Sequence, residues 1–311
     1  MIRAICLNPA IDRTYYIDGF EAGDKYKNNH PRECAGGKGV NVAKGCGQLR
    51  EPAAIYGFVG GAAGKRVRGE MERCCRSVRL VEIEGQTRTT INVIDRRRRR
   101  ETEILEAGPQ VTGRQVDALL GLLEKDLYRG DIVVCSGISI VGAPRDIYVR
   151  ISRMCRSVGA VCVLDANGES MRDAAEGQYY LCKPNQNELA ELCGVAPTTD
   201  PELLCRMARQ VLPGRFSWIM VSMGDLGGLL VSGTECCLAR VPEVPVMSTI
   251  GSGDACVAGF CVGLAQGLAP RRAFVLGMAC GVVNSMCDGV ACVTRGQVYG
   301  LLDQITISDP E

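Results

Sequence analysis

The stretch Ser248-Thr249-Ile250-Gly251-Ser252-Gly253-Asp254-Ala255-Cys256-Val257-Ala258-Gly259-Phe260 places a glycine-rich turn and one carboxylate directly before an apolar segment that can form a helix. Glycines let the backbone approach an anion closely, and a following helix supplies unpaired N–H groups and the positive end of its dipole. The turn Gly251-Ser252-Gly253, with Asp254 as a base, therefore suits the transfer of a phosphoryl group to a hydroxyl. The alternative is a turn that only introduces an ordinary core helix.

The composition is that of a soluble globular protein. The 311 residues are 46% hydrophobic and 23% charged, and Lys+Arg 36 against Asp+Glu 35 gives a net charge of +1. A neutral chain gives no reason to expect nucleic acid or a membrane surface as partner. Residues 1–9 lack the apolar length of a signal peptide, and no later apolar run approaches the length of a membrane span. We therefore expect a cytoplasmic protein.

The 18 cysteines lie mostly in apolar runs or in adjacent pairs such as Cys74-Cys75 and Cys236-Cys237, and we interpret them as small core residues. The sequence has no Cys-x-x-Cys motif and only one histidine, His30. Zinc fingers, thioredoxin-type redox chemistry and histidine-rich metal sites therefore find little support. His30 stands in the polar stretch 27–31, and we interpret it as a solvated loop residue.

A second glycine-rich element precedes another predicted helix. Ala35-Gly36-Gly37-Lys38-Gly39 leads into residues 40–49, whose apolar positions have helical spacing. This arrangement resembles a turn that cradles a phosphate. It is not a Walker A loop, because Gly39 follows Lys38 where that motif requires Ser or Thr.

The whole chain alternates between predicted strands and helices, which indicates an α/β protein with a mostly parallel sheet and helices on both faces. Predicted strands cover 2–7, 15–17, 53–59, 132–135, 161–164, 180–182, 218–222 and 228–231, and predicted helices cover 65–76, 111–127, 145–158, 188–193 and 201–212, with further helices from 254, 271 and 296. A predicted hairpin, 90–95 with 103–106, surrounds the run Arg96 to Arg100. We favour a solvated hairpin tip for this run over a patch that binds polyanions.

Polar residues follow several predicted strands, and ligands of such sheets bind outside the carboxyl ends of the strands. The groups are Asp12, Ser136-Gly137, Asp165, Lys183-Pro184-Asn185-Gln186-Asn187-Glu188 and Ser222-Met223-Gly224-Asp225-Leu226-Gly227. One cleft could hold them all. Each also has a simpler interpretation: Asn185 or Asp165 as a helix N-cap, Gly224 and Gly227 as hairpin glycines, and Lys183 as a solvated loop residue.

Two of these motifs resemble the signatures of the PfkB family of sugar kinases. Residues 35–43 are similar to the first signature and residues 249–254 to the second, with Ser252 where the family usually has Ala. The resemblance implies a ribokinase-like three-layer α/β/α fold over 1–311 as a single domain, with a mostly parallel central sheet and a small β-sheet lid from about 12–34 and 87–106. It also implies ATP and Mg²⁺ as cofactors, leaves a monovalent cation open, and suggests a homodimer through the lid.

The same resemblance assigns roles to individual residues. Asp254 would be the catalytic base in the turn of Gly251, Ser252 and Gly253, and the motif of Asn185 and Glu188 would hold Mg²⁺ and the ATP phosphates through water. Further residues expected around ATP are Lys183, Ser222, Gly224, Gly227 and Asn284. For Asn284, an asparagine on a helix surface is the alternative.

Within the family, residues 7–12, Thr87-Arg88 and residues 102–109 resemble the 1-phosphofructokinase and tagatose-6-phosphate kinase branch. This implies ATP-dependent phosphorylation of a hexose phosphate, with fructose 1-phosphate as the first candidate; tagatose 6-phosphate, fructose 6-phosphate and a catalytically silent sugar-phosphate sensor are the alternatives. Arg and Lys are the side chains that a phosphate requires. The substrate-binding residues would be Asp12, Gly36, Gly37 and Asn41 for the sugar, and Lys25, Lys38 and Arg88 for its phosphate.

Two departures from the branch pattern concern the sugar. Ile138 stands where the branch usually has a hydroxyl, and the stretch 23–28 lacks the usual Asn-Arg-Val run. The reaction type is therefore better defined by the sequence than the identity of the sugar. A dinucleotide-binding enzyme would need Gly-x-Gly-x-x-Gly after the first strand, where this chain has Asn8-Pro9-Ala10-Ile11-Asp12.

Overall fold

A computed structural model describes residues 1–27, 30–98, 100–174 and 176–309, so that Asn28 and Asn29 of the predicted lid, Arg99 of the arginine run and the last two residues of the predicted domain lie outside it. In this part of the chain the main sheet has ten strands in the order β14-β13-β12-β11-β10-β9-β8-β1-β4-β5. Neighbours from β5 to β11 are parallel, and β12 to β14 are added antiparallel. The strands are β1 (Ile2–Cys6), β4 (Ala54–Val59), β5 (Ser77–Glu82), β8 (Ile132–Ser136), β9 (Val161–Asp165), β10 (Tyr179–Cys182), β11 (Phe216–Ser222), β12 (Gly228–Val231), β13 (Cys236–Arg240) and β14 (Thr306–Ser308).

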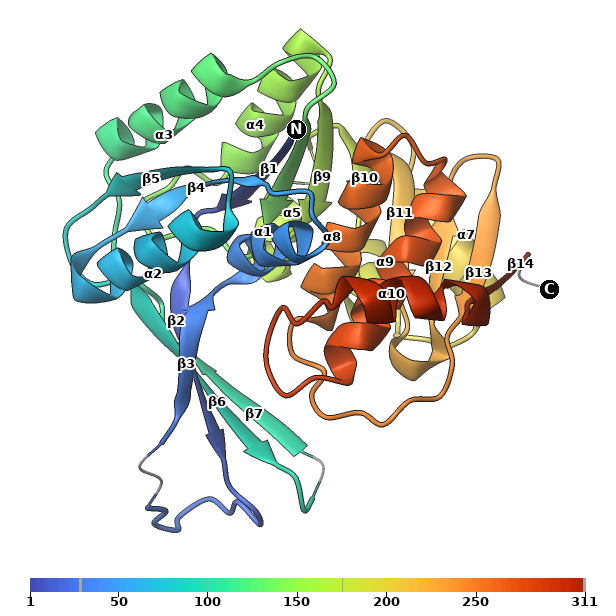
Figure 1. The fold of residues 1–311 in the computed structure, drawn as a ribbon. Helices are drawn as coiled ribbons and strands as arrows, with labels where there is room; N and C mark the ends of the chain where they lie inside the picture. Colours follow the sequence, from blue (N-terminus) through green and yellow to red (C-terminus); the bar gives the residue numbers. More distant parts are fainter. Residues whose placement is uncertain (28–29, 99, 175, 310–311) are drawn as a thin grey trace.

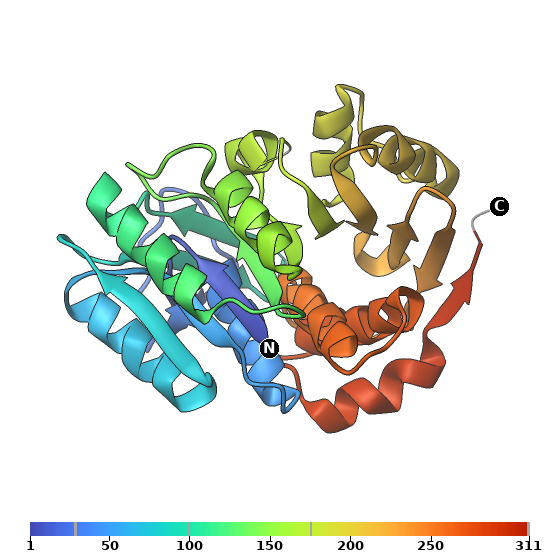
Figure 2. The ribbon, with the colours of Figure 1, turned by 90° about the horizontal axis from the view of Figure 1, so that it is seen from above.

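Helices cover both faces of this sheet (Figures 1 and 2). One hydrophobic cluster joins the sheet to α1 (Lys38–Gln48), α2 (Gly61–Cys74), α8 (Ser252–Ala265), α9 (Pro270–Ser285) and α10 (Arg295–Leu301). A second cluster joins the opposite face to α3 (Gly113–Asp126), α4 (Ile147–Val158), α5 (Gly168–Ala174), α6 (Gln186–Cys193) and α7 (Pro201–Val211). Short 3₁₀ turns occur at η1 (Gly224–Leu226) and η2 (Leu302–Gln304). The predicted three-layer α/β/α architecture is confirmed.

The central strands are apolar along their whole length because both of their faces are covered. Every residue of β1, β4 and β8 is buried, which is the pattern expected for a parallel sheet between two layers of helices. Local side chains cap some of the helix starts: Thr112 and Gln115 form a reciprocal capping box for α3, and Asp200 caps α7. None of the helices in the described ranges combines the length and hydropathy that a membrane span requires.

A separate four-stranded sheet, which we call the lid, extends away from the main sheet (Figure 1). Its order is β3-β2-β6-β7, formed by β2 (Ala10–Tyr16), β3 (Arg32–Gly36), β6 (Arg88–Asp95) and β7 (Arg100–Leu105). A small sheet is therefore present near the predicted residues 12–34 and 87–106, and its role as a lid stays a prediction.

The first strand of the lid was predicted at residues 15–17, and this position was wrong. Asp12 lies inside β2 and does not follow a strand of the main sheet, because residues from Ala10 onward pair with β3 on one side and β6 on the other.

The arginine run forms the tip of the β6–β7 hairpin, as we expected. Among its described members, Arg96 to Arg98 form the turn and Arg100 begins β7. Asp95 accepts hydrogen bonds from the backbone N–H groups of Gly19, Phe20 and Arg98, which ties the tip to the loop after β2. Arg96 also forms an ion pair with Asp288, 3.1 Å apart, so that the lid contacts the segment after α9.

Several elements were not predicted. These are β5, β13, β14 and α5, each a strand or helix of at most seven residues. Two of them, β5 and β14, lie at the two edges of the sheet, where partial exposure breaks the continuous apolar pattern that identified the central strands. The helix predicted at 65–76 begins earlier, at Gly61. The sequence did not indicate this start, because the first turn of the helix contains glycine and alanine and carries no capping side chain.

Candidate active site

A cavity of about 590 Å³ lies at the carboxyl ends of the parallel strands, between the main sheet and the lid. The chain leaves β1 toward β4 on one side and returns through β8 on the other, so the order of strands reverses between β1 and β8. Ligands of open α/β sheets bind at such a reversal. The cavity is lined by Cys6, Asn8, Asp12, Gly37, Lys38, Asn41, Arg88, Thr90, Glu101, Glu103, Leu105, Ser136, Gly137, Ile138, Asn167, Lys183, Asn185, Glu188, Ser222, Thr249, Ile250, Gly251, Gly253 and Asp254.

Asp254 lies in the first turn of α8 and is only 6% exposed. Its Oδ2 accepts a hydrogen bond from Asn41 Nδ2 at 2.8 Å, which fixes the orientation of the carboxylate. Burial raises the pKa of Asp254 to about 7, assisted by the charge of Asp165 and opposed by Lys38, Asn41 and Lys183. A carboxylate with a pKa near neutrality is suited to accept a proton from a hydroxyl.

The backbone before Asp254 presents N–H groups to the cavity. Gly251 is the N-cap of α8 with φ 77°, and a Cβ built on it would lie 2.7 Å from Val290 Cγ1, so both the conformation and the space require glycine. The N–H of Ser252 is bonded to the carbonyl of Thr249 at 3.1 Å. The donors that remain at this helix start are therefore the N–H groups of Gly251, Gly253 and Asp254, and they form an anion-binding end.

Asn284 supports this turn from behind. It is fully buried, and its Nδ2 donates to the carbonyl of Ile250 at 2.9 Å and to Ser252 Oγ at 3.1 Å. Its Oδ1 accepts from the N–H of Cys292. The alternative of an asparagine on a helix surface is therefore wrong, and the proximity to adenine stays a prediction.

Two lysines share one buried carboxylate at the base of the cavity. Asp165 Oδ1 lies 3.1 Å from Lys38 Nζ and 3.2 Å from Lys183 Nζ. Burial alone would raise the pKa of Asp165, but the two lysines outweigh it and hold the pKa below its usual value. Burial alone would lower the pKa of Lys38, but nearby carboxylates, above all Asp165, raise it. Lys183 is buried, so the solvated-loop alternative for it is wrong.

Arg88 gives the lid side of the cavity a positive charge. It is 7% exposed, and its guanidinium donates to two carbonyl oxygens, those of Asn8 at 3.2 Å and Glu106 at 3.3 Å. Within the described residues it forms no ion pair with a carboxylate. Asp12 and Glu103 act on Arg88 only through longer-range charge interactions, so its guanidinium can still bind an anionic ligand in the cavity.

Asp12 lies beside this arginine. Burial raises the pKa of Asp12 to about 6; Lys44 and Arg88 oppose the shift, and Glu103 adds to it. Gly36 faces this carboxylate, because a Cβ on Gly36 would lie 2.0 Å from Asp12 Oδ2. Gly36 thus makes room for Asp12 rather than lining the cavity itself.

Asn185 and Glu188 form a capping box at the start of α6. Asn185 Oδ1 accepts from the N–H of Glu188 at 2.9 Å, and Glu188 Oε2 accepts from the N–H of Asn185 at 2.8 Å. The predicted N-cap role of Asn185 is confirmed, and both side chains also line the cavity together with Ser222. The remaining carboxylate oxygen of Glu188 stays available to a ligand.

Some predicted site residues lie elsewhere. Lys25 is exposed in the loop between β2 and β3, and in the described structure it does not line the cavity. Gly224 and Gly227 form the turn between β11 and β12, which confirms the hairpin alternative for them. Ser252 lies behind the cavity, as do Gly36 and Asn284. The roles of these residues toward ligands stay predictions.

The structure also adds residues to the site. Glu101 of β7 accepts two hydrogen bonds from Thr249, from its N–H at 2.9 Å and from its hydroxyl at 2.8 Å, and thereby joins the lid to the turn before α8. Glu103 lies on the same face of β7, two residues away, and lines the cavity. Strand alternation could have grouped these two residues, but nothing local indicates the contact with Thr249. The sequence did not indicate three further residues that line the cavity, because no local pattern places them there; these are Asn8, Thr90 and Asn167. Ile138, which the sequence did single out, also lines the cavity.

Known proteins are similar to this chain over nearly its whole length. The model of the pfkB family of carbohydrate kinases matches residues 5–292. The 1-phosphofructokinase of Bacillus subtilis is 30% identical over 308 residues, which are 99% of each protein. The tagatose-6-phosphate kinase of Staphylococcus epidermidis is 29% identical over 309 residues, again 99% of each.

Solved structures agree with this result. The crystal structure of a putative phosphofructokinase from Staphylococcus aureus superposes with a TM-score of 0.83 at 28% identity, covering 100% of both chains. The ribokinase of Thermotoga maritima superposes with a TM-score of 0.79 at 19% identity, covering 97% of this chain and 99% of that one. The second likeness identifies the fold as ribokinase-like.

Proposed function

Because the chain belongs to the pfkB family of carbohydrate kinases, we propose that it transfers the γ-phosphoryl group of ATP to fructose 1-phosphate and forms fructose 1,6-bisphosphate. Homologues of this kind are phosphotransferases that act on an alcohol group. The proposal concerns the sugar, the cofactors and the role of each residue.

One arrangement supports the proposal above all others: a buried carboxylate at a helix N-terminus and a buried arginine without a carboxylate partner in the described structure line one cavity. The first, Asp254, suits the hydroxyl that is phosphorylated. The second, Arg88, suits a phosphate that the sugar already carries, because guanidinium binds phosphate oxygens through paired hydrogen bonds. A kinase for unphosphorylated sugars would have no need for Arg88 in this position.

The mechanism follows from the charges in the cavity. Asp254, held by Asn41, accepts the proton of the attacking hydroxyl while the oxygen approaches the γ-phosphorus. The N–H groups of Gly251, Gly253 and Asp254 stabilise the negative charge of the transferring group, and Lys38 and Lys183 add positive charge nearby. One such donor contributes about 3 to 4 kcal/mol to transition-state stabilisation.

The cofactors fit the carboxylates that are present. Mg²⁺ in kinases is held by one or two carboxylates and by the phosphates of the nucleotide, and it neutralises charge on those phosphates. Glu188 offers a carboxylate oxygen to the cavity, and the described residues hold no group of three or more metal-binding side chains. We therefore place Mg²⁺ at Glu188, bound through water and the phosphates of ATP. Asn185, Lys183 and Ser222 would contact the nucleotide.

A second candidate substrate is tagatose 6-phosphate, because a tagatose-6-phosphate kinase is nearly as similar to this chain as the 1-phosphofructokinase. Ile138 bears on this choice, since it lines the cavity where the branch usually has a hydroxyl. An aliphatic side chain cannot hydrogen-bond a sugar hydroxyl, so Ile138 itself can contact a sugar only through its shape.

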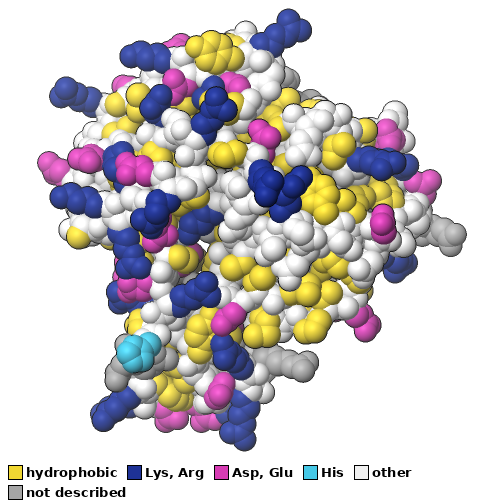
Figure 3. Space-filling model, viewed as in Figure 1, with side chains coloured by type: hydrophobic (Ala, Val, Ile, Leu, Met, Phe, Trp, Pro, Cys, Tyr) yellow, Lys and Arg dark blue, Asp and Glu magenta, His cyan; other side chains and the backbone are white. Residues whose placement is uncertain are grey.

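The partners of the protein are small molecules in this proposal. The face in Figure 3 mixes basic and acidic side chains, which offers no broad positive surface to a nucleic acid. We place the protein in the cytoplasm, where ATP and sugar phosphates occur, and treat 1–311 as one kinase domain.

The test is a coupled assay of ADP release with fructose 1-phosphate, fructose 6-phosphate, tagatose 6-phosphate and unphosphorylated fructose and tagatose. We expect the highest kcat/KM with fructose 1-phosphate. Arg88→Met should raise KM for the sugar phosphate about 10- to 100-fold and leave KM for ATP nearly unchanged, as expected for the loss of one charge-assisted contact. A preference for unphosphorylated sugars would refute the role of Arg88, and a preference for tagatose 6-phosphate would replace the proposed substrate.

A further inference from the structure

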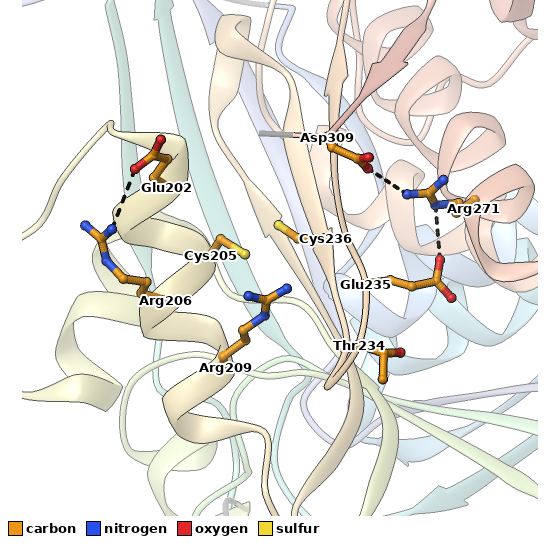
Figure 4. A pocket seen from close by; sticks show the side chains of 9 residues that line it. All are labelled: Glu202, Cys205, Arg206, Arg209, Thr234, Glu235, Cys236, Arg271 and Asp309. Carbon is orange, nitrogen blue, oxygen red and sulfur yellow. Dashed lines mark hydrogen bonds and ion pairs between the residues drawn. The ribbon is translucent and has the colours of Figure 1, made fainter. Parts of the chain in front are cut away.

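A second cavity of about 590 Å³ lies at the opposite end of the sheet from the active site (Figure 4). Its position follows from strand register: Ser222, in the active site, pairs with Gly228 at one end of β12, whereas Cys236 pairs with Val231 at the other end. The two cavities share no lining residue. The residues around the second one are Glu202, Cys205, Arg206, Arg209, Thr234, Glu235, Cys236, Arg271 and Asp309.

Two thiols face each other in this cavity. Cys205 of α7 and Cys236 of β13 point their sulfur atoms toward one another (Figure 4), and the sulfur of Cys205 is close enough to influence the pKa of Cys236. They are 6% and 8% exposed, and this small exposure opens into the cavity, so a small solute reaches them. All 18 cysteines of the chain are free thiols.

The two sulfurs differ in their environment. Burial and the neighbouring sulfur of Cys205 raise the pKa of Cys236, while Arg209 opposes the shift. Cys205 lies on α7, one helical turn before Arg209, whereas Cys236 lies at the start of β13. This position makes Cys205 the sulfur placed to attack an oxidant and Cys236 the thiol placed to complete the reaction.

Arg209 supplies a cation beside the pair. It follows Cys205 by one helical turn, and its guanidinium points into the cavity (Figure 4). The other arginines there have carboxylate partners: Arg206 lies 3.6 Å from Glu202, and Arg271 binds Glu235 and Asp309. In the described part of the chain, Arg209 has none. A cation that is not neutralised by a carboxylate favours the thiolate form of a nearby cysteine.

We propose that Cys205 and Cys236 are a dithiol site that hydrogen peroxide oxidises to a disulfide linking α7 to β13. The thiolate of Cys205 attacks one peroxide oxygen, the O–O bond breaks, and the leaving hydroxide takes a proton to become water. Cys236 sulfur then attacks the sulfenic acid of Cys205, the S–O bond breaks, and a second water leaves with the proton of Cys236. Two thiols lose two electrons and two protons, and peroxide is reduced to two molecules of water.

The experiment exposes the folded, reduced protein to a small excess of hydrogen peroxide, alkylates the remaining thiols after denaturation, and maps disulfides by peptide mass spectrometry. We expect one main cross-linked peptide pair, containing Cys205 and Cys236. The chain offers an internal control, because Cys135 and Cys162 have sulfur atoms 3.9 Å apart but are buried in the core and line neither of the two cavities. Those two should stay reduced.

Substitutions separate the site from nonspecific oxidation. Arg209→Met should slow formation of the disulfide about 3- to 10-fold, because the neighbouring cation is lost, whereas Arg206→Met on the same helix should not. Cys205→Ser and Cys236→Ser should each abolish the cross-link. The oxidised wild-type protein should melt about 5 °C higher than the reduced one, and the serine variants should not show this shift.

The proposal is overturned if Cys205 and Cys236 stay reduced while other cysteines oxidise, if the pair in the core oxidises equally fast, or if Arg209→Met and Arg206→Met behave alike. The measurement does not depend on the sugar substrate. A failure here therefore leaves the proposed kinase function untouched, and a failure of the kinase assay leaves this site untouched.

Discussion

Asp254 must be ionised to act as a base, yet its burial opposes ionisation and raises its pKa to about 7. Removing the charge while keeping the shape separates these two effects. Asp254→Asn should lower kcat about 10²- to 10⁴-fold, as expected for loss of a general base, and leave KM for ATP within a few-fold of wild type. Steady-state kinetics with fructose 1-phosphate measure both values. Near-normal turnover of the variant would rule out Asp254 as the base.

Asp254→Asn should also change how the stability of the folded protein depends on pH. Below about pH 4 the carboxyl is protonated in both the folded and the unfolded chain; between about pH 4 and 7 only the unfolded chain ionises it, because the folded-state pKa is raised from 3.8 to about 7. The contribution of Asp254 to stability therefore falls as pH rises through this range. Asp254→Asn should gain in melting temperature relative to wild type between pH 5 and pH 8. If the difference in melting temperature between Asp254→Asn and wild type stays the same over this pH range, the raised pKa of Asp254 is contradicted.

Activity should depend on pH through the same residue. The kcat/KM of the free enzyme should fall as pH drops below about 7, because Asp254 becomes protonated, and Asp12 with a pKa of about 6 should steepen the fall. The measurement is a profile of kcat/KM for fructose 1-phosphate from pH 5 to 9. Asp12→Asn serves as the control: the ionisation near pH 7 should persist and the lower one should disappear. A flat profile down to pH 5 would argue against a buried base.

At the scale of elements, the site depends on how the lid meets the start of α8. Glu101 of β7 binds both the N–H and the hydroxyl of Thr249, the residue two positions before Gly251. We expect Glu101→Gln to weaken lid closure, lower kcat/KM for the sugar phosphate about 10-fold, and raise ATP hydrolysis without sugar, since an open lid admits water. The two activities are measured as sugar phosphorylation and sugar-independent ADP release.

Glu106→Gln is the matched control for this contact. Its carboxylate accepts the N–H of Thr89 within the lid and does not reach the turn before α8. This variant should keep sugar phosphorylation and ATP hydrolysis coupled. If both glutamine variants behave alike, Glu101 acts only by stabilising the lid sheet, and the contact with Thr249 has no separate function.

The sequence predicted elements well where a local signal exists and poorly where a distant contact decides. Glycine-rich turns before α1 and α8, and the capping pair Asn185 and Glu188, are local, and each appeared at the cavity. The contact between Glu101 and Thr249 joins residues 148 positions apart, and no local pattern encodes it. The burial of Asn284 was not predicted for the same reason: it depends on the turn that Asn284 supports, which lies 34 positions away.

At the scale of the whole molecule, the main sheet is closed on both faces by helices, whereas the lid ends in an open edge. All six residues of β7 are exposed, and Ile104 is 56% exposed. Ile104 points away from the face of Glu101 and Glu103 that lines the cavity, because side chains alternate along a strand. An exposed edge strand with an apolar side chain is a surface that pairs readily with another chain. This geometry supports the prediction of a homodimer formed through the lid.

Ile104→Glu tests this assembly without touching the cavity face. We expect wild-type protein to sediment as a dimer and the variant as a monomer in analytical ultracentrifugation over a range of concentrations, because a charge at the edge strand opposes pairing. Tyr128→Glu is the control: Tyr128 is 67% exposed but lies between α3 and β8 on the main body, so the dimer should persist. A monomeric wild type, or a dimer that survives in Ile104→Glu, would contradict assembly through the lid. Loss of activity together with the dimer would further indicate that pairing of two lids holds each of them in the closed position.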